Sequence, residues 1–225
     1  MRPDTLILHY TGMGSGLQAL AWLCNPASSV SCHYLVEEDG EAMQLVPEAR
    51  RAWHAGKSFW AGDADLNSRS IGIEIVNGGH PAGLPPYPSA QIDAVIALSL
   101  DLCRRYAIAP QRVLAHSDIA PRRKIDPGEL FPWDRLHRAG VGHWVAPAAI
   151  VDGPELSLGA AGEPVANLQH MLADYGYAIE PTGLFDETTR FAVIAFQRHF
   201  RSEQVDGVAD VSTIETLRML IERRP

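Results

Sequence analysis

The sequence predicts an α/β (α+β) fold with one sheet covered by helices, followed by a small three-helix domain. Short β-rich runs and a helical segment fill the first 145 residues, and three helical segments follow a stretch rich in Gly and Pro. The charge divides at the same place: residues 1–150 carry 13 basic and 15 acidic groups, whereas residues 151–225 carry 6 and 12. These observations predict two unequal domains.

In the first domain, apolar and β-branched runs indicate strands, and two of them flank an Asp39-Gly40 hairpin signal. The expected strands are Thr5–Tyr10, Cys32–Glu37, Ala42–Val46, Ile71–Val76 and Arg112–Ala115. Apolar residues at helical spacing predict a helix over Ser89–Tyr106, with Ser89 as its N-cap. We expect the sheet to lie under this helix.

In the second domain, each helix has a start signal. Pro164 opens the first helix, which Gly176 ends; Asp186 caps the second; Ser212 and Glu215 form a capping-box pattern for the third. Between about Gly140 and Gly162, apolar residues follow neither helical nor strand spacing for any length. We therefore predict domains at 1–145 and 155–225, with a linker at 146–154.

The composition excludes several classes of protein. A net charge of −8 disfavours a basic nucleic-acid binder, and no apolar run is long enough for a transmembrane helix. Three cysteines cannot form a disulfide scaffold, so we expect buried thiols. No signal peptide is visible, which indicates either a cytosolic protein or an export sequence missing from this chain.

Two histidines and one aspartate stand where a metal site could form. His9 and His116 each follow an apolar strand run, and Asp126 lies in a rigid Lys-Ile-Asp-Pro-Gly turn. Two imidazoles and one carboxylate leave one open position on a tetrahedral zinc ion, as in catalytic sites. The alternative is that each histidine merely ends a strand. The spacing is not HExxH, which disfavours a zincin.

Two charged residues could act beside such a metal. Glu74 shares one strand face with Gly72 and Val76, opposite three isoleucines, where a carboxylate is costly to bury without a partner. It could serve as a general base, or it could simply lie at an exposed sheet edge. Lys124, two residues before Asp126, could stabilise an oxyanion, or it could belong to a solvated basic turn.

Other hydrolytic chemistry has less support. Gly14-Ser15-Gly16 lacks the strand–turn–helix context of a serine nucleophile. Cys32 and His33 are neighbours in an expected strand, so they would point to opposite faces and could not form a dyad. No phosphate-binding glycine loop occurs in the sequence.

The motifs LILHYT, VSCHYLVEEDG, RAWHAG, LNSRSIGIEIVN and LAHSDIAPRRKIDPGELFPW run in one order through the first domain. This domain resembles the zinc-dependent N-acetylmuramoyl-L-alanine amidases of the type 2 family, which include the peptidoglycan-recycling amidases. The resemblance implies a mixed central sheet covered by helices. It also implies roles for seven residues: zinc ligands His9, His116 and Asp126, catalytic Glu74 and Lys124, and substrate-groove residues Arg51 and His54.

The tail resembles the peptidoglycan-binding type 1 module over about residues 155–222, through Val165, Leu168-Gln169, Gly183-x-Phe185-Asp186 and Asp206-Gly207-Val208. We expect Tyr175, Tyr177 and the turn at Phe185 to present a sugar-binding surface. Deleting the tail would then spare turnover of a small soluble substrate. The alternative is a three-helix cap that only covers the enzyme.

Together these resemblances imply hydrolysis of the amide between N-acetylmuramic acid and L-alanine, with one Zn²⁺ per chain and peptidoglycan or muropeptides as partners. A non-catalytic peptidoglycan receptor and a phage-type endolysin are the alternatives. All three ligand positions and Glu74 are present, which favours the enzyme. The binding module suggests the cell envelope, whereas the missing signal peptide suggests the cytoplasm.

Overall fold

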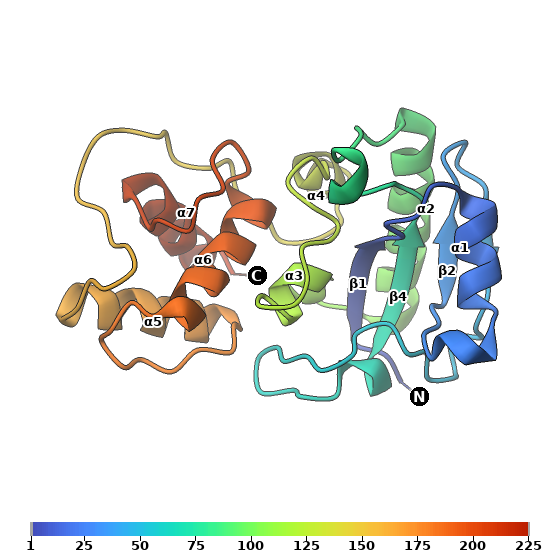
Figure 1. Ribbon diagram of the computed structural model, residues 1–225, viewed down its shortest axis with the longest axis horizontal. Coiled ribbons are helices and arrows are strands. Elements are labelled where there is room, and N and C mark those ends of the chain that lie inside the picture. Colours follow the sequence, from blue (N-terminus) through green and yellow to red (C-terminus); the bar gives the residue numbers. More distant parts are fainter. Residues whose placement is uncertain (1, 225) are drawn as a thin grey trace.

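The computed structural model describes residues 2–224, which form a mixed sheet with helices around it and a C-terminal group of three helices (Figure 1). The strands are β1 (Thr5–Tyr10), β2 (Tyr34–Val36), β3 (Ala42–Gln44), β4 (Ser70–Ile75) and β5 (Val113–Ala115). The α-helices are α1 (Gly16–Leu23), α2 (Ser89–Tyr106), α3 (His116–Ile119), α4 (Trp133–Arg138), α5 (Glu163–Tyr175), α6 (Glu187–Phe200) and α7 (Val211–Glu222). Short 3₁₀ turns occur at Pro26–Ser28, Leu66–Ser68, His80–Ala82 and Pro110–Arg112.

The sheet has the order β3-β2-β4-β1-β5 and is parallel except for the antiparallel pair of β2 and β3. This confirms the mixed sheet and the hairpin at Asp39-Gly40. The first strand has the expected bounds and β4 is shifted by one residue, whereas β2, β3 and β5 are shorter than expected. Among residues 2–224, none of the helices combines the length and hydropathy that crossing a bilayer requires.

The two sides of β1 pack into different cores. Leu6 and Leu8 join the isoleucines of β4 and the apolar face of α2 in a core built within the first 141 residues. Ile7, on the opposite side of the strand, belongs to a second core that also contains side chains from α5, α6 and α7. The C-terminal helices therefore share a core with the sheet domain, and α3 lies between them in Figure 1.

This shared core overturns the expected sugar-binding surface. Tyr175, Tyr177 and Phe185 are at most 5% exposed, because both tyrosine rings pack edge-on against Trp60 of the first domain and Phe185 lies inside the helical group. An aromatic residue with a hydroxyl fits a buried interface as well as a surface, so the sequence pattern could not distinguish the two.

Three local expectations were wrong. Ser89 is the first residue of α2 and makes no capping hydrogen bond, since Pro88 holds the N-cap position. At α7 the cap is Asp210, whose side chain accepts from the Thr213 N–H, while the Ser212 hydroxyl donates to the Ala148 carbonyl. Of the three free thiols, Cys24 is exposed rather than buried.

The other helix signals were confirmed. Pro164 lies in the first turn of α5, which ends before Gly176, and Asp186 caps α6 through the Thr189 N–H. Val145 already belongs to the core shared with the C-terminal helices. The domain boundaries at 1–145, 146–154 and 155–225 therefore stay a prediction.

Candidate metal and catalytic site

The register of the sheet brings two histidines together. Leu8 of β1 pairs with Ala115 of the parallel strand β5, so His9 and His116 each follow one residue later at the same edge. Carboxyl ends of neighbouring parallel strands are a common place for a site. Asp126 comes from the loop after α3, and its carbonyl accepts a hydrogen bond from the Ser117 N–H.

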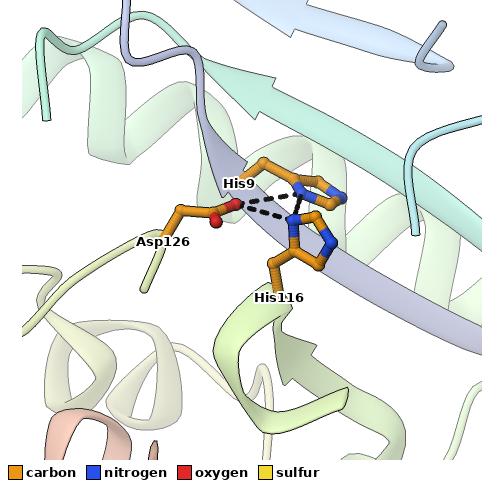
Figure 2. Close-up of side chains that lie close together, drawn as sticks. All are labelled: His9, His116 and Asp126. Atoms are coloured by element: carbon orange, nitrogen blue, oxygen red, sulfur yellow. Dashed lines mark hydrogen bonds and ion pairs between the residues drawn. The ribbon is translucent and has the colours of Figure 1, made fainter. Parts of the chain in front are cut away.

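The three side chains converge on one point (Figure 2). His9 Nδ1 lies 2.8 Å from His116 Nδ1 and 3.1 Å from Asp126 Oδ2, and His116 Nδ1 lies 2.9 Å from the same oxygen. All three residues are buried. A tetrahedral site with ligand bonds of about 2.0–2.1 Å, the range found for zinc, has edges of about 3.3–3.4 Å, so the three atoms need to separate by only about half an ångström or less to hold such an ion.

The hydrogen bonds behind His9 fix its tautomer. The Ser70 hydroxyl donates to the Leu66 carbonyl at 2.6 Å, so its oxygen is free to accept from His54 Nε2 at 3.3 Å. His54 Nδ1 then accepts from His9 Nε2 at 3.0 Å, which leaves a lone pair on His9 Nδ1. Burial lowers the pKa of His54 well below its usual value and, with neighbouring His116, lowers that of His9 to about 4. Both rings are therefore neutral.

The second imidazole is oriented in the same way. His116 Nε2 donates to the Ala55 carbonyl at 3.2 Å, so its Nδ1 also presents a lone pair. Asp126 Oδ2 lies within 3.1 Å of both Nδ1 atoms, so the carboxylate faces the two lone pairs directly. In these tautomers, two imidazole lone pairs and a carboxylate oxygen face one another. A divalent cation fits this donor set, and such outer hydrogen bonds are typical of metal-binding histidines.

Glu74 lies beside the three converging groups. It pairs in register with His9 on the neighbouring strand, and its side chain is partly buried. Its Oε2 atom has no hydrogen-bond partner within residues 2–224. Burial and the Asp126 charge raise the pKa of Glu74 well above its usual value, whereas Lys124 opposes this shift. A carboxylate oxygen that is both buried and unpaired is costly, so it is best explained by a function.

A cleft of about 240 Å³ opens over this group. Its polar floor contains His54, Glu74, His116, Lys124 and Asp126. Its walls are formed by the last residue of β1, by residues of α1 and by neighbouring loops: Tyr10, Thr11, Met13, Ala19, Trp22, Leu23, Val30, Ser31 and Trp53. No hydrogen bond or ion pair engages the Lys124 ammonium among the described residues, so it is free to meet a substrate.

The structure thus brings together six of the seven residues that the sequence singled out. Arg51 lies apart from the cleft: it bonds to Asp65 at 2.6 Å and to Ser68, and its guanidinium stacks 4.2 Å from the ring centre of Trp53. His54 lines the cleft but is also bonded to the back of His9. A role of Arg51 and His54 in substrate binding stays a prediction.

Several contributors were missed. Trp53 lies in the segment RAWHAG and could have been found there, since a tryptophan between two predicted groove residues is a binding signal; in the structure it is exposed. Trp22 gave no such signal because it falls within an apolar helix. Ser70 has no sequence pattern at all, because its role depends on a long-range contact with His54.

This constellation is consistent with the metal site of a hydrolase: a buried carboxylate and a lysine lie beside a triad that could hold a cation, at the carboxyl edge of a mixed sheet. Residues 1–129 match the family model of N-acetylmuramoyl-L-alanine amidases, and residues 161–217 match that of a peptidoglycan binding domain. The chain belongs to the N-acetylmuramoyl-L-alanine amidase family.

Relatives support this membership along the whole chain. The N-acetylmuramoyl-L-alanine amidase AmiD of Escherichia coli is 42% identical over 240 residues, which cover 99% of this chain and 83% of AmiD. The 1,6-anhydro-N-acetylmuramyl-L-alanine amidase AmpD of Enterobacter cloacae is 41% identical over 117 residues, covering 52% of this chain and 59% of AmpD.

Two solved structures are similar over the same range. One is E. coli AmiD in complex with the substrate anhydro-N-acetylmuramic acid-L-Ala-D-gamma-Glu-L-Lys, with a TM-score of 0.84, 38% identity and coverage of 99% of this chain and 90% of that one. The other is AmpDh3 from Pseudomonas aeruginosa, with a TM-score of 0.84, 32% identity and coverage of 100% and 93%.

Proposed function

We propose that this amidase holds one Zn²⁺ on His9, His116 and Asp126 and hydrolyses the amide between N-acetylmuramic acid and L-alanine in muropeptides. The observation that carries the proposal is the unpaired Glu74 oxygen beside three converging lone-pair donors. When bound, zinc supplies Lewis acidity that polarises a carbonyl group and acidifies a water molecule. The substrate in the AmiD complex suggests the same substrate class here.

The residues of the chain divide the remaining work. Glu74 accepts a proton from the attacking water and returns it to the departing alanine nitrogen, since its Oε2 atom has no hydrogen-bond partner within residues 2–224. Lys124 stabilises the negative charge that develops on the scissile carbonyl oxygen. The apolar wall with Trp22 and Trp53 excludes water and positions the substrate.

The reaction is tested by mass spectrometry of the products from a soluble anhydro-muropeptide and from intact sacculi. We expect a free peptide beginning with L-alanine and a peptide-free muramyl product, lost after chelation and restored by zinc. A binding-only protein would give neither product with either substrate. Faster release from sacculi than from the soluble muropeptide would favour a lytic over a recycling role.

The role of Glu74 is tested by Glu74→Gln, which keeps the shape of the side chain but removes the proton acceptor. We expect kcat to fall by about 10²- to 10⁴-fold with zinc content unchanged. The matched control is Glu38→Gln, a carboxylate lost from the exposed hairpin turn, which should keep wild-type kinetics. Near wild-type activity in Glu74→Gln would assign the proton transfer to another group.

The ligand set is tested by metal analysis of three variants. Wild-type protein should contain about one zinc per chain, and His9→Ala, His116→Ala and Asp126→Ala should each lose most of it, because two donors do not make a stable site. Full zinc retention in two of the three variants would refute this ligand set.

A further inference from the structure

A buried carboxylate lies two residues after His116. Asp118 of α3 is fully buried, and it is not part of the cleft. Its Oδ2 accepts from the backbone N–H of Ala115 at 2.8 Å, which ties it to the end of β5. A buried carboxylate needs several such partners to offset its desolvation.

The other two partners of Asp118 come from the C-terminal helical region. The Tyr177 hydroxyl donates to Oδ1 at 2.8 Å, and His199 Nδ1 of α6 donates to Oδ2 at 2.7 Å. The His199 ring is itself fixed, because it stacks 3.7 Å from Trp133 and 3.8 Å from Phe200, measured between ring centres. Two side chains that are rigidly held thus converge on one carboxylate.

The short helix α3 connects Asp118 to the metal ligands. His116 is the first residue of α3, between Ala115, which donates to Asp118, and Ser117, which donates to the Asp126 carbonyl at 3.0 Å. The backbone around His116 is therefore bonded to Asp118 on one side and to the Asp126 loop on the other. A displacement of Asp118 would move two of the three ligands.

We propose that Tyr177 and His199 are positioning residues of the metal site, which hold His116 and Asp126 in place through Asp118. The inference rests on the proposed metal site. It gives the C-terminal region a part in catalysis that is separate from any binding of peptidoglycan.

The first test compares two tyrosines. Tyr177→Phe removes the hydroxyl that reaches Asp118, and Tyr175→Phe removes a buried hydroxyl that bonds instead to His143 Nδ1 at 3.0 Å. Both variants lose one buried hydrogen bond in the same region, so we expect similar losses of apo-protein thermal stability. Only Tyr177→Phe should weaken zinc binding, by about 10-fold in chelator competition, since outer hydrogen bonds contribute on this scale.

Two further readouts separate positioning from a general loss of structure. In Co²⁺-substituted protein, the visible absorption spectrum should change for Tyr177→Phe and stay as in wild type for Tyr175→Phe. With the soluble muropeptide, Tyr177→Phe should lower kcat and leave KM within about twofold, because the cleft walls are untouched.

The second test separates the hydrogen-bond donor of His199 from the packing of its ring. His199→Phe keeps a ring between Trp133 and Phe200 but lacks the donor, whereas His199→Asn keeps a donor near the position of Nδ1 but lacks the ring. We expect zinc affinity to be retained better in His199→Asn than in His199→Phe. The reverse order would overturn the proposal, because it would show that ring packing alone matters.

Zinc affinity in Tyr177→Phe equal to that of wild type, or an equal loss in Tyr175→Phe, would also overturn it. Neither result would contradict the proposed amidase function, provided that the wild-type protein binds zinc and releases the peptide from the muropeptide. Failure of wild type to bind zinc would instead overturn the metal site itself.

Discussion

The two histidines of the proposed metal site are supported from different regions of the molecule. Behind His9, the hydrogen bonds run through His54 and Ser70 to the Leu66 carbonyl, all within the sheet domain. Around His116, the support depends on Asp118, two of whose partners belong to the C-terminal region. If the proposed positioning role holds, the sheet domain supplies the supporting hydrogen bonds of only one of the two histidines.

The two apolar cores also differ in whether they depend on the C-terminal helices. The core under α2 is closed within the sheet domain, whereas the core around Ile7 needs side chains from α5 to α7. If the C-terminal helices were an independent module joined only by a linker, both apolar cores would be complete without them. The C-terminal helices are thus part of the body that carries the site.

The largest effect is expected from removing residues 146–225. Trp60, Ile119 and Ala120 would lose the helices that cover them, so we expect aggregation or a large drop in Tm, and loss of zinc. This reverses the expectation that the tail is dispensable for small substrates. Soluble yield, zinc content and turnover of a soluble muropeptide measure it. If the truncated chain kept zinc affinity and turnover within twofold of wild type, the C-terminal helices would not support the His116 side of the site.

A smaller effect is expected on the His9 side from Gly72→Ala. A Cβ at Gly72 would lie 2.5 Å from the His54 ring, which must shift away from His9. We expect a loss of about 1–3 kcal/mol in the free energy of unfolding and weaker zinc binding. Gly14→Ala is the control, because its Cβ meets only the flexible Gln18 side chain at 3.4 Å. Equal zinc affinities in both variants would show that His54 does not position His9.

How far the sequence could anticipate this site depends on the range of each contact. His9, His116 and Glu74 were found because a strand pattern is local and the parallel register then aligns them. Asp118 and His199 were missed, and Tyr177 was assigned to a surface, because their contacts join residues 59 and 81 positions apart, which no local period encodes.

The same reason explains the errors at helix ends. Asp210 and Ser212 are both good capping residues, and the pattern alone could not choose between them. The choice is made by tertiary structure, since the Ser212 hydroxyl is taken by the Ala148 carbonyl before α5. The fold class was predictable and the junction between its parts was not.

A still smaller effect is expected from Ser70→Ala. It removes the acceptor of His54 Nε2, and His54 is then free to take the other tautomer, so we expect zinc binding to weaken a few-fold, at the low end of the range for outer contacts. The control is Ser99→Ala on α2, which deletes a buried hydroxyl that has no partner within the described chain. Chelator competition on both variants measures the difference. Equal zinc affinities would show that Ser70 does not help to orient His9.

The smallest effect is expected from Arg51→Ala. Its side chain is partly buried but its partner Asp65 is exposed, so the ion pair contributes about 0–1 kcal/mol, and the side chain does not line the cleft. We expect unchanged kcat and a modest rise in KM, because Trp53 loses the guanidinium stacked on it. Steady-state kinetics on the soluble muropeptide test this, and a large fall in kcat would place Arg51 at the reacting groups.

The unity of the two regions is tested most directly by calorimetric unfolding of the full chain with and without zinc. Because the core around Ile7 is shared, we predict a single transition that zinc moves to higher temperature as a whole. Two separate transitions, of which zinc moves only one, would contradict the claim that the C-terminal helices and the metal-bearing sheet form one cooperative body.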